Sequence, residues 1–263
     1  MPSRRAINRR TALTILGGAG LGAVGLGACS SGDPVTAASS SAAAPSPAVG
    51  TGSASATASA TSAAGGPVTA SMFGGAATCA VAPEQTEGPY YIDVDKIRAD
   101  IREDRQGTPL RVAARVLDAD GCTPIKDAIF EIWHCDAGGL YSGFEAASRG
   151  GGVATDETRY LRGAQITDAD GIAVITTIYP GWYRGRTVHI HAKVAVSNSA
   201  VLTTQLYFDE ATTARVYTAA PYSANPGPDT SNSDDGIYRS ETTLTLSQDG
   251  DGYLGLITIG VDA

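Results

Sequence analysis

The sequence predicts an all-β protein, a β-sandwich of mostly antiparallel strands with a short N-terminal helix and long loops. Apolar runs of seven to ten residues recur between turn-forming residues. Several of these runs alternate polar with apolar positions, as strands with one buried face do. No stretch shows the 3.6-residue apolar period of a long amphipathic helix. Strands that follow one another without helical crossovers favour two sheets packed face to face.

The expected strands are Leu110–Leu117, Ala128–Cys135, Ile172–Ile178, Thr187–Val196, Leu202–Phe208, Glu241–Ser247 and Tyr253–Val261. The fourth run has the clearest strand pattern, because it places four aliphatic residues at alternate positions. A short helix is expected near Val94–Glu103. The tetrapeptide DADG occurs at Asp118–Gly121 and again at Asp168–Gly171, where Asp and Gly favour β-turns.

The first 28 residues are expected to be an export signal. The string Asn8–Leu13 resembles a twin-arginine export motif, and an apolar run without acidic residues follows it. Leu26–Cys29 resembles a lipobox, in which Cys29 is lipidated and becomes the first residue of the mature protein. The apolar run is short and rich in glycine for a transmembrane span. We therefore expect an exported protein, held by a lipid anchor on the extracellular face of the cell membrane.

Residues 29–70 consist almost entirely of Ala, Ser, Thr, Gly and Pro, and are expected to be a disordered tether. Residues 71–263 are then expected to form one folded domain. The full chain carries a net charge of −8. Subtracting the four arginines of the signal from the 19 Lys and Arg residues leaves 15, against 27 Asp and Glu. A mature chain this acidic argues against nucleic acid as a partner.

Three cysteines remain beyond the lipobox. Cys79 and Cys122 each stand beside turn-forming residues, whereas Cys135 lies within an apolar run. In an oxidising compartment we expect the first two to form a disulfide and Cys135 to remain a buried thiol.

A metal site is indicated by His189 and His191, which alternate on a predicted strand and so point to one face, roughly 6.5–7 Å apart. Tyr183 and Arg186 precede the pair, and Tyr160 lies about thirty residues upstream of it. Phenolate is a hard anionic ligand, and a trivalent cation can lower the tyrosine pKa of about 10 enough to ionise it at neutral pH. This combination of residues points to ferric iron.

The His-x-His pair alone leaves other sites open. A cupin would need a glutamate soon after the pair and a later histidine, and the sequence has neither. A zinc hydrolase would need a third ligand, which His134 or a turn aspartate would have to supply. A ferrous site of the two-histidine type would need a nearby carboxylate. The alternatives are therefore another metallo-oxygenase or hydrolase, or a lipid-anchored β-sandwich module that binds without catalysis.

A series of motifs resembles one known family in order along residues 83–208. These motifs are Thr86–Tyr91, Cys122–Ala128, Glu131–Asp136, Gly139–Gly143, Tyr160–Gly163, Thr167–Gly171, Thr177–Tyr183, Arg186–His191 and Thr203–Phe208. They are similar to motifs of the intradiol ring-cleavage dioxygenases, the protocatechuate and catechol dioxygenase superfamily, and most similar to its exported branch. The resemblance implies a β-sandwich that binds non-haem Fe(III) through two tyrosines and two histidines.

By position, the resemblance implies the metal ligands Tyr160, Tyr183, His189 and His191. Tyr183 resembles the tyrosinate that leaves iron when substrate binds, which also makes it a catalytic proton acceptor. Tyr160 matches the retained tyrosinate, and Tyr141 and Tyr179 are the alternative donors in its place.

Two further catalytic residues are implied in the same way. Arg186 resembles the arginine beside the bound ring, and Gln205 resembles the glutamine near the oxygen-binding side. The implied reaction is Fe(III)-dependent cleavage of a catechol-type aromatic diol by O2, between the two hydroxyl-bearing carbons, to a cis,cis-muconate-type product. The implied partners are the diol, O2 and further copies of the chain, because family members generally associate. The membrane is a partner through the lipid anchor only.

Overall fold

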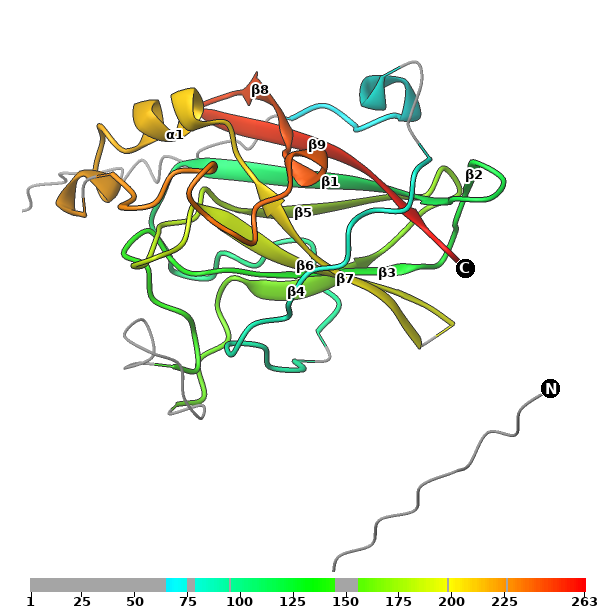
Figure 1. The fold of residues 1–263 in the computed structure, drawn as a ribbon, viewed down its shortest axis with the longest axis horizontal. Coiled ribbons are helices and arrows are strands. Elements are labelled where there is room, and N and C mark those ends of the chain that lie inside the picture. The colour runs from blue at the N-terminus through cyan, green and yellow to red at the C-terminus, as the bar shows by residue number, and fades with distance from the viewer. Residues whose placement is uncertain (1–64, 75–78, 95, 145–155, 198, 226) are drawn as a thin grey trace, which may run out of the picture. The chain divides into compact units, whose positions relative to one another are not determined.

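The strands form two sheets that lie face to face as the layers of a β-sandwich (Figure 1). This all-β architecture confirms the predicted fold class. The protein is represented by a computed structural model, which describes residues 65–74, 79–94, 96–144, 156–197, 199–225 and 227–263.

The first sheet has five strands: β1 (Pro109–Asp118), β2 (Thr123–Pro124), β5 (Ile172–Ile178), β8 (Thr245–Asp249) and β9 (Gly252–Val261). β1 lies between antiparallel β5 and parallel β9, and its end pairs with β2. β8 pairs antiparallel with β9.

The second sheet has four strands: β4 (Arg162–Ile166), β3 (Ile129–Trp133), β6 (His189–Val196) and β7 (Ser199–Tyr207), in that order across the sheet. All its pairs are antiparallel. The one parallel pair in the sandwich is therefore β1 with β9 among the named strands of the described part.

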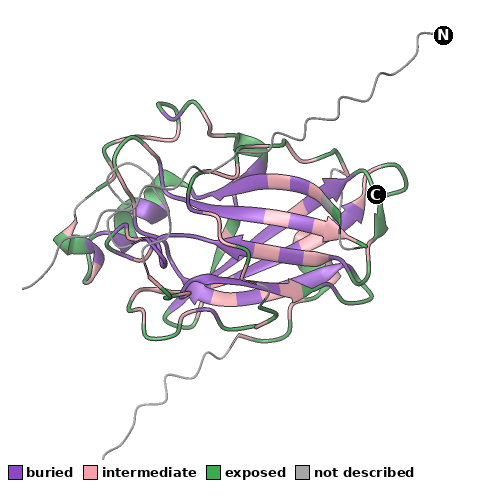
Figure 2. Cartoon of the chain, turned by 90° about the horizontal axis from the view of Figure 1, so that it is seen from below, coloured by how far each residue is buried: buried purple, intermediate pink, exposed green. Residues whose placement is uncertain are grey.

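The hydrophobic core fills the space between the sheets. Phe130, Ile132 and Ile190 of the second sheet pack with Val112 and Ile175 of the first, and all five are fully buried. Each side chain buried in this way contributes about 1.5–3 kcal/mol to stability. Figure 2 shows the result, with buried residues along the strands and exposed residues mainly on the loops. Because side chains alternate along a strand, the residues between these point to the outer face of the second sheet.

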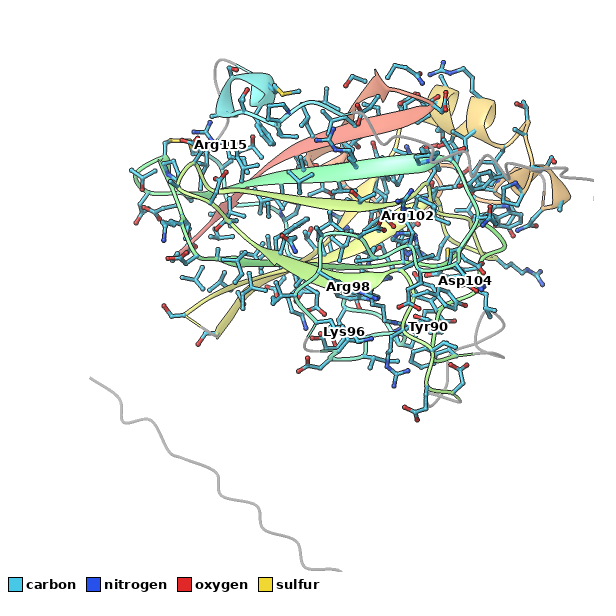
Figure 3. The ribbon with its side chains drawn as sticks, turned by 180° about the vertical axis from the view of Figure 1, so that it is seen from behind. Tyr90, Lys96, Arg98, Arg102, Asp104 and Arg115 are labelled. Atoms are coloured by element: carbon cyan, nitrogen blue, oxygen red, sulfur yellow. A yellow bond between two sulfur atoms is a disulfide. The ribbon has the colours of Figure 1, made fainter. Side chains whose placement is uncertain are left out.

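The prediction of a short helix near Val94–Glu103 is wrong, because the described residues of this segment form isolated β-bridges and end in a turn. Their backbone pairs with the open edges of both sheets, at Ala164 of β4 and Thr176 of β5. The segment also buries Ile101 completely in the core. Two unpaired strand edges offer backbone partners that outweigh a weak local helix propensity. Figure 3 labels Lys96, Arg98 and Arg102 of this segment, and Asp104 directly after it.

Other elements differ from the predicted set. β4 was not expected, nor was helix α1 (Glu210–Val216), which Asp209 caps by accepting the Thr212 N–H at 2.7 Å. The strand expected at Glu241–Ser247 begins as a 3-10 turn, and the pairing of β8 starts only at Thr245. Two further 3-10 turns lie at Ala70–Phe73 and Tyr222–Ala224.

Residues 65–70, which the sequence assigns to the tether, contact the folded part. The Gly66 carbonyl accepts a hydrogen bond from Arg111 of β1 at 3.0 Å, and Val68 packs with Phe73 against the first sheet. The rest of the tether and the export signal with Cys29 lie outside the described residues. Within the described part, no helix is long and apolar enough to cross a membrane.

The cysteines agree with the expectation from the sequence. Cys79 and Cys122 form a disulfide with their Cα atoms 5.4 Å apart, and Cys135 is a buried free thiol. Beside the disulfide, Val81 bridges Gly260 of β9, so the bond fastens the N-terminal segment to the first sheet.

Candidate metal centre

The candidate site lies on the outer face of the second sheet. The register of the four strands places Arg162, Trp133, His191 and Gln205 side by side across it. His189 precedes His191 on the same face of β6 and pairs with Tyr207 of β7. The strand alternation that buries the aliphatic residues in the core therefore brings these polar and aromatic residues together on the other side.

The two histidine rings are neighbours, with centroids 4.9 Å apart. Nδ1 of His189 lies 2.7 Å from the Thr187 carbonyl oxygen, so Nδ1 carries the proton and Nε2 carries the lone pair. The His191 ring stacks on Trp133 at 5.0 Å, and both of its nitrogens are buried without a hydrogen-bond partner in the described structure. Each ring can thus offer a nitrogen to a metal ion.

Two tyrosines reach the histidine pair from separate loops. Asp136 joins these loops, because its carbonyl oxygen accepts the N–H of Gly181 at 3.0 Å. A Cβ on Gly139 would lie 2.2 Å from a carbonyl oxygen of the second loop, so this close approach requires glycine, which here has a φ of +87°. The Tyr141 and Tyr183 rings consequently lie 5.8 Å apart.

Both tyrosines also contact the histidines. The Tyr183 hydroxyl lies 3.1 Å from His189 Nε2, and the Tyr141 ring lies 6.1 Å from the His191 ring. The Tyr141 hydroxyl is buried and makes no hydrogen bond of ordinary geometry within the described part. Tyr90 stacks on Tyr141 at 4.5 Å and meets Tyr183 edge-on at 5.9 Å, so it covers this side of the site.

Tyr160 lies elsewhere, and the choice of Tyr160 as the second tyrosine does not agree with this geometry. Its ring lies under the Arg105 guanidinium at 4.4 Å and lines a surface groove of about 400 Å³ with charged residues. In a regular strand Tyr160 would share a face with Arg162. Leu161 between them has a φ of +56°, which breaks the alternation and turns Tyr160 away. Tyr141, an alternative donor from the sequence, is the tyrosine that reaches the pair.

The remaining candidates are used in the structure of the core. The Tyr179 hydroxyl bonds to Thr213 at 2.7 Å, and its ring packs against Phe208. Both ring nitrogens of His134 have partners, the Cys135 carbonyl and the Thr177 hydroxyl. Among the described residues, no three His, Cys, Asp or Glu side chains are grouped to hold a metal. The donors that do meet are therefore imidazoles and phenols.

Burial shifts the pKa of both histidines. Burial, and next the Arg186 charge, lowers the pKa of His189 to about 3. Burial, and next the charge of His189, holds the pKa of His191 well below its ordinary value. Both imidazoles are therefore neutral at pH 7, which is the form that binds metal.

The phenols are shifted in the opposite direction. Burial raises the pKa of Tyr183, although Arg186 opposes the shift, and burial also raises that of Tyr141. The phenolates that would ligate a metal form here only if a strong cation compensates their charge. Two neutral imidazoles and two phenols with a buried, unsatisfied hydroxyl among them fit a hard trivalent ion.

Arg186 and Gln205, both predicted, lie at this site. Arg186 Nη1 is 3.4 Å from His189 Nε2, and Nη2 donates to Gln205 Oε1 at 2.5 Å. Gln205 in turn donates to the Thr86 carbonyl at 2.9 Å. Sequence reasoning did not find Arg162 or Asp235, a buried acid on Arg186, because neither stands near the His-x-His motif in the chain.

Comparison with known proteins decides the family. The family model described as "Dioxygenase" matches residues 85–220, more than half of the chain. The chain belongs to this dioxygenase family. An intradiol ring-cleavage dioxygenase of Tetranychus urticae is 32% identical, with a TM-score of 0.66 over 70% of this chain and 95% of that one. The dioxygenase domain of a carbohydrate-binding fusion protein from Streptomyces sp. SirexAA-E is 29% identical, with a TM-score of 0.52 over 68% and 96%.

Curated relatives of this chain include enzymes named for catechols. Catechol 1,2-dioxygenase 1 of Acinetobacter lwoffii is 31% identical over 148 residues, 47% of this chain and 45% of that protein. A chlorocatechol 1,2-dioxygenase of a Pseudomonas species is 28% identical over 144 residues, 47% of this chain and 54% of that protein. The chain spans about half the length of the curated relatives it matches.

Proposed function

We propose that this dioxygenase binds Fe(III) and uses O2 to cleave a catechol-type aromatic diol between its hydroxyl-bearing carbons, giving a cis,cis-muconate-type product. One observation carries the proposal: Tyr141, Tyr183, His189 and His191 converge, and the described structure gives neither the His191 nitrogens nor the Tyr141 hydroxyl a hydrogen bond of ordinary geometry. The names of the similar proteins, which act on catechol and chlorocatechol, support the substrate class.

Iron held by these four residues would supply a Lewis acid that withdraws electron density from a bound diol and makes its ring reactive toward O2. The residues around it have separate tasks. The imidazoles are neutral donors, and two phenolates lower the net charge of a trivalent ion inside a buried site. Tyr183 is the phenol nearer to His189 and Arg186. We therefore assign Tyr183 as the ligand that substrate would replace, and its phenolate would accept a proton from a substrate hydroxyl.

Arg186 provides a positive charge on the His189 side of the site. Its Nη1 faces His189 Nε2, next to the place where a diol oxygen would bind, so the guanidinium can stabilise negative charge that develops on the ring. Gln205 holds the guanidinium on one side and the Thr86 backbone on the other. The polar groups are thus fixed before substrate arrives.

Spectroscopy of the purified protein tests the iron assignment. Phenolate ligands should make the iron-loaded protein red-brown, with a broad visible band that shifts when catechol is added. Tyr141→Phe should weaken the band and lose iron, whereas Tyr160→Phe, a matched change outside the site, should keep both. The iron-loaded protein should also convert catechol and O2 to a muconate. Zinc in place of iron, a colourless iron protein or an unaltered band in Tyr141→Phe would contradict the ligand set.

We also propose that the chain is exported by a twin-arginine signal and anchored through a lipid on Cys29, and that copies of it associate. The sequence alone supports these three statements. Cys29→Ser should move the protein from the membrane fraction to the soluble exported fraction with its activity intact. A protein that stays with the membrane after this change would exclude Cys29 as the anchor.

A further inference from the structure

Asp235 is a buried carboxylate from a loop far along the chain, and it lies directly against Arg186. Its side chain is only 2% exposed, and its Oδ2 accepts the Arg186 Nε–H at 2.8 Å. The same oxygen accepts the Thr187 N–H at 3.0 Å, and Oδ1 accepts the Ile237 N–H at 2.9 Å. Burial by itself would raise the pKa of Asp235, but the hydrogen bonds of Ile237 and Arg186 outweigh it and hold this pKa below its ordinary value.

The Arg186 guanidinium has a different partner in each direction. Nε donates to Asp235, Nη2 donates to Gln205, and Nη1 faces His189. A guanidinium is a rigid plane with donors at fixed angles. Fixing Nε and Nη2 therefore also fixes the direction of Nη1, the nitrogen that faces the candidate metal centre.

The loop that carries Asp235 is itself tied to the site. The Ile237 carbonyl accepts hydrogen bonds from Gln85 and, at 3.2 Å, from the Tyr207 hydroxyl. Gln205 Oε1 lies 3.3 Å from the same hydroxyl and shares its single hydrogen with the Ile237 carbonyl. The hydrogen bonds thus close a ring from Arg186 through Asp235, its own loop and Tyr207 to Gln205, and back to Arg186.

We propose that Asp235 is a positioning residue, whose carboxylate aims Arg186 at the His189 side of the site before substrate binds. The inference rests on the proposed function, and it adds a residue outside the family motifs of the sequence. Without this carboxylate the guanidinium would be buried with no counter-ion, and it would turn toward solvent and away from His189. A displacement of about 1 Å can lower turnover on the order of 10²-fold.

Asp235→Asn is the central variant, because it keeps the size of the side chain and removes the charge. We expect kcat to fall on the order of 10²-fold with KM little changed, since Arg186 acts after the substrate has bound. Asp234→Asn is the matched control. It is the neighbouring carboxylate, it bonds only to Ser231 in the described structure, and it should leave kcat unchanged.

A double variant separates positioning from general damage. Arg186→Gln should lower kcat on the order of 10²–10³-fold. If Asp235 acts through Arg186, then adding Asp235→Asn to Arg186→Gln should lower kcat no further. A loss that multiplies instead would show that Asp235 acts independently, and would overturn the proposal.

Crystal structures of the Asp235 and Asp234 variants give a readout that does not depend on turnover. The Arg186 guanidinium should leave His189 in Asp235→Asn and stay in place in Asp234→Asn; an unmoved guanidinium in Asp235→Asn would overturn the proposal. If Asp235→Asn does not fold, Asp235→Glu replaces it, because it retains the charge but shifts the carboxylate by one methylene. The Arg186 guanidinium should then also move away from His189. A wild-type protein without iron or diol cleavage would remove the proposed function, and the crystal structures would still decide the role of Asp235.

Discussion

At the scale of single residues, His191 is the side chain that most needs a ligand. Its ring is 1% exposed, packs flat against Trp133, and has no hydrogen bond at either nitrogen in the described structure. A buried polar group left without a partner costs about 1–3 kcal/mol. A metal bond at one nitrogen would remove this cost, so the metal and the fold stabilise each other.

The substitution His191→Phe should therefore affect stability and iron binding in opposite directions. A phenyl ring keeps the stacking on Trp133 and removes the unsatisfied nitrogens, so the iron-free variant should unfold at the same temperature as the iron-free wild type, or higher. The same variant should bind no iron. Thermal unfolding with and without added iron measures both effects. A clearly less stable iron-free variant would mean that His191 has a structural partner.

Tyr183→Phe should separate iron binding from catalysis. The change removes the hydroxyl 3.1 Å from His189 Nε2 and leaves the other three donors, so iron should be retained better than in a histidine variant. Activity should fall sharply, because the proton acceptor for the substrate is lost. Iron content and catechol turnover of the same sample check this expectation, with His189→Ala as the comparison that should lose both. Wild-type turnover in Tyr183→Phe would exclude the proton-acceptor role.

At the scale of elements, a strap formed by Thr86–Tyr91 crosses the site. Its ends are fixed by Gln205, which donates to the Thr86 carbonyl at 2.9 Å, and by Glu131, which accepts from the Tyr91 hydroxyl at 3.2 Å. Lys193 of β6 pairs with Glu87 at 2.5 Å, and its ammonium also lies 3.5 Å from the centre of the Tyr91 ring. The middle of the strap is Gly88, which has a φ of +74° and lies directly over His191.

Gly88→Ala should weaken iron binding through this contact. A Cβ there would lie 3.0 Å from His191 Cε1, and its positive φ adds roughly 1–2 kcal/mol of backbone strain. Gly250→Ala is the matched control, because its φ is +60° and its Cβ would meet no atom within 4 Å among the described residues. Both variants should unfold more easily, and only Gly88→Ala should release iron faster to a chelator. Equal release rates would mean that a Cβ at position 88 does not disturb His191.

At the scale of the whole molecule, the N-terminal segment is held to the sandwich by covalent and non-covalent contacts. The Cys79–Cys122 disulfide closes a loop with a sequence separation of 43, which includes the strap and the segment that pairs with both sheet edges. The N–H of Ala82 also donates to the Gly260 carbonyl of β9 at 2.9 Å. The disulfide therefore lowers the conformational entropy of the unfolded chain over the loop that contains the strap.

Replacing both Cys79 and Cys122 by Ser should lower the free energy of unfolding by roughly 3–4 kcal/mol, from the chain entropy of a loop this long. Denaturant unfolding of the variant and of the wild type measures the difference. Cys135→Ser is the control, because it replaces a buried cysteine by serine without breaking a disulfide. An unchanged midpoint in the double Ser variant would show that the bond contributes nothing to stability.

Much of the fold was predictable because local patterns determine it. Strands such as β1, β5 and β9 were predicted within about two residues of their observed ends. Each of these segments has its own apolar pattern and is flanked by turn-forming residues. The segment around Ile97 and Ile101 was misjudged because its backbone partners are the edges of two sheets that the sequence does not place. The short helix α1 and strand β4 were missed because neither segment shows a clear apolar period.

The sequence by itself determined the face shared by His189 and His191, since alternation along one strand is a local property. It also placed Arg186 and Gln205 at the site by resemblance to a family. Only the tertiary structure decided which tyrosine meets the histidines. A positive φ at Leu161 turns Tyr160 away, and a glycine-dependent approach of two loops brings Tyr141 in. Both effects depend on backbone torsions and on contacts between distant segments. The periodicity of the sequence predicts neither the torsions nor the contacts.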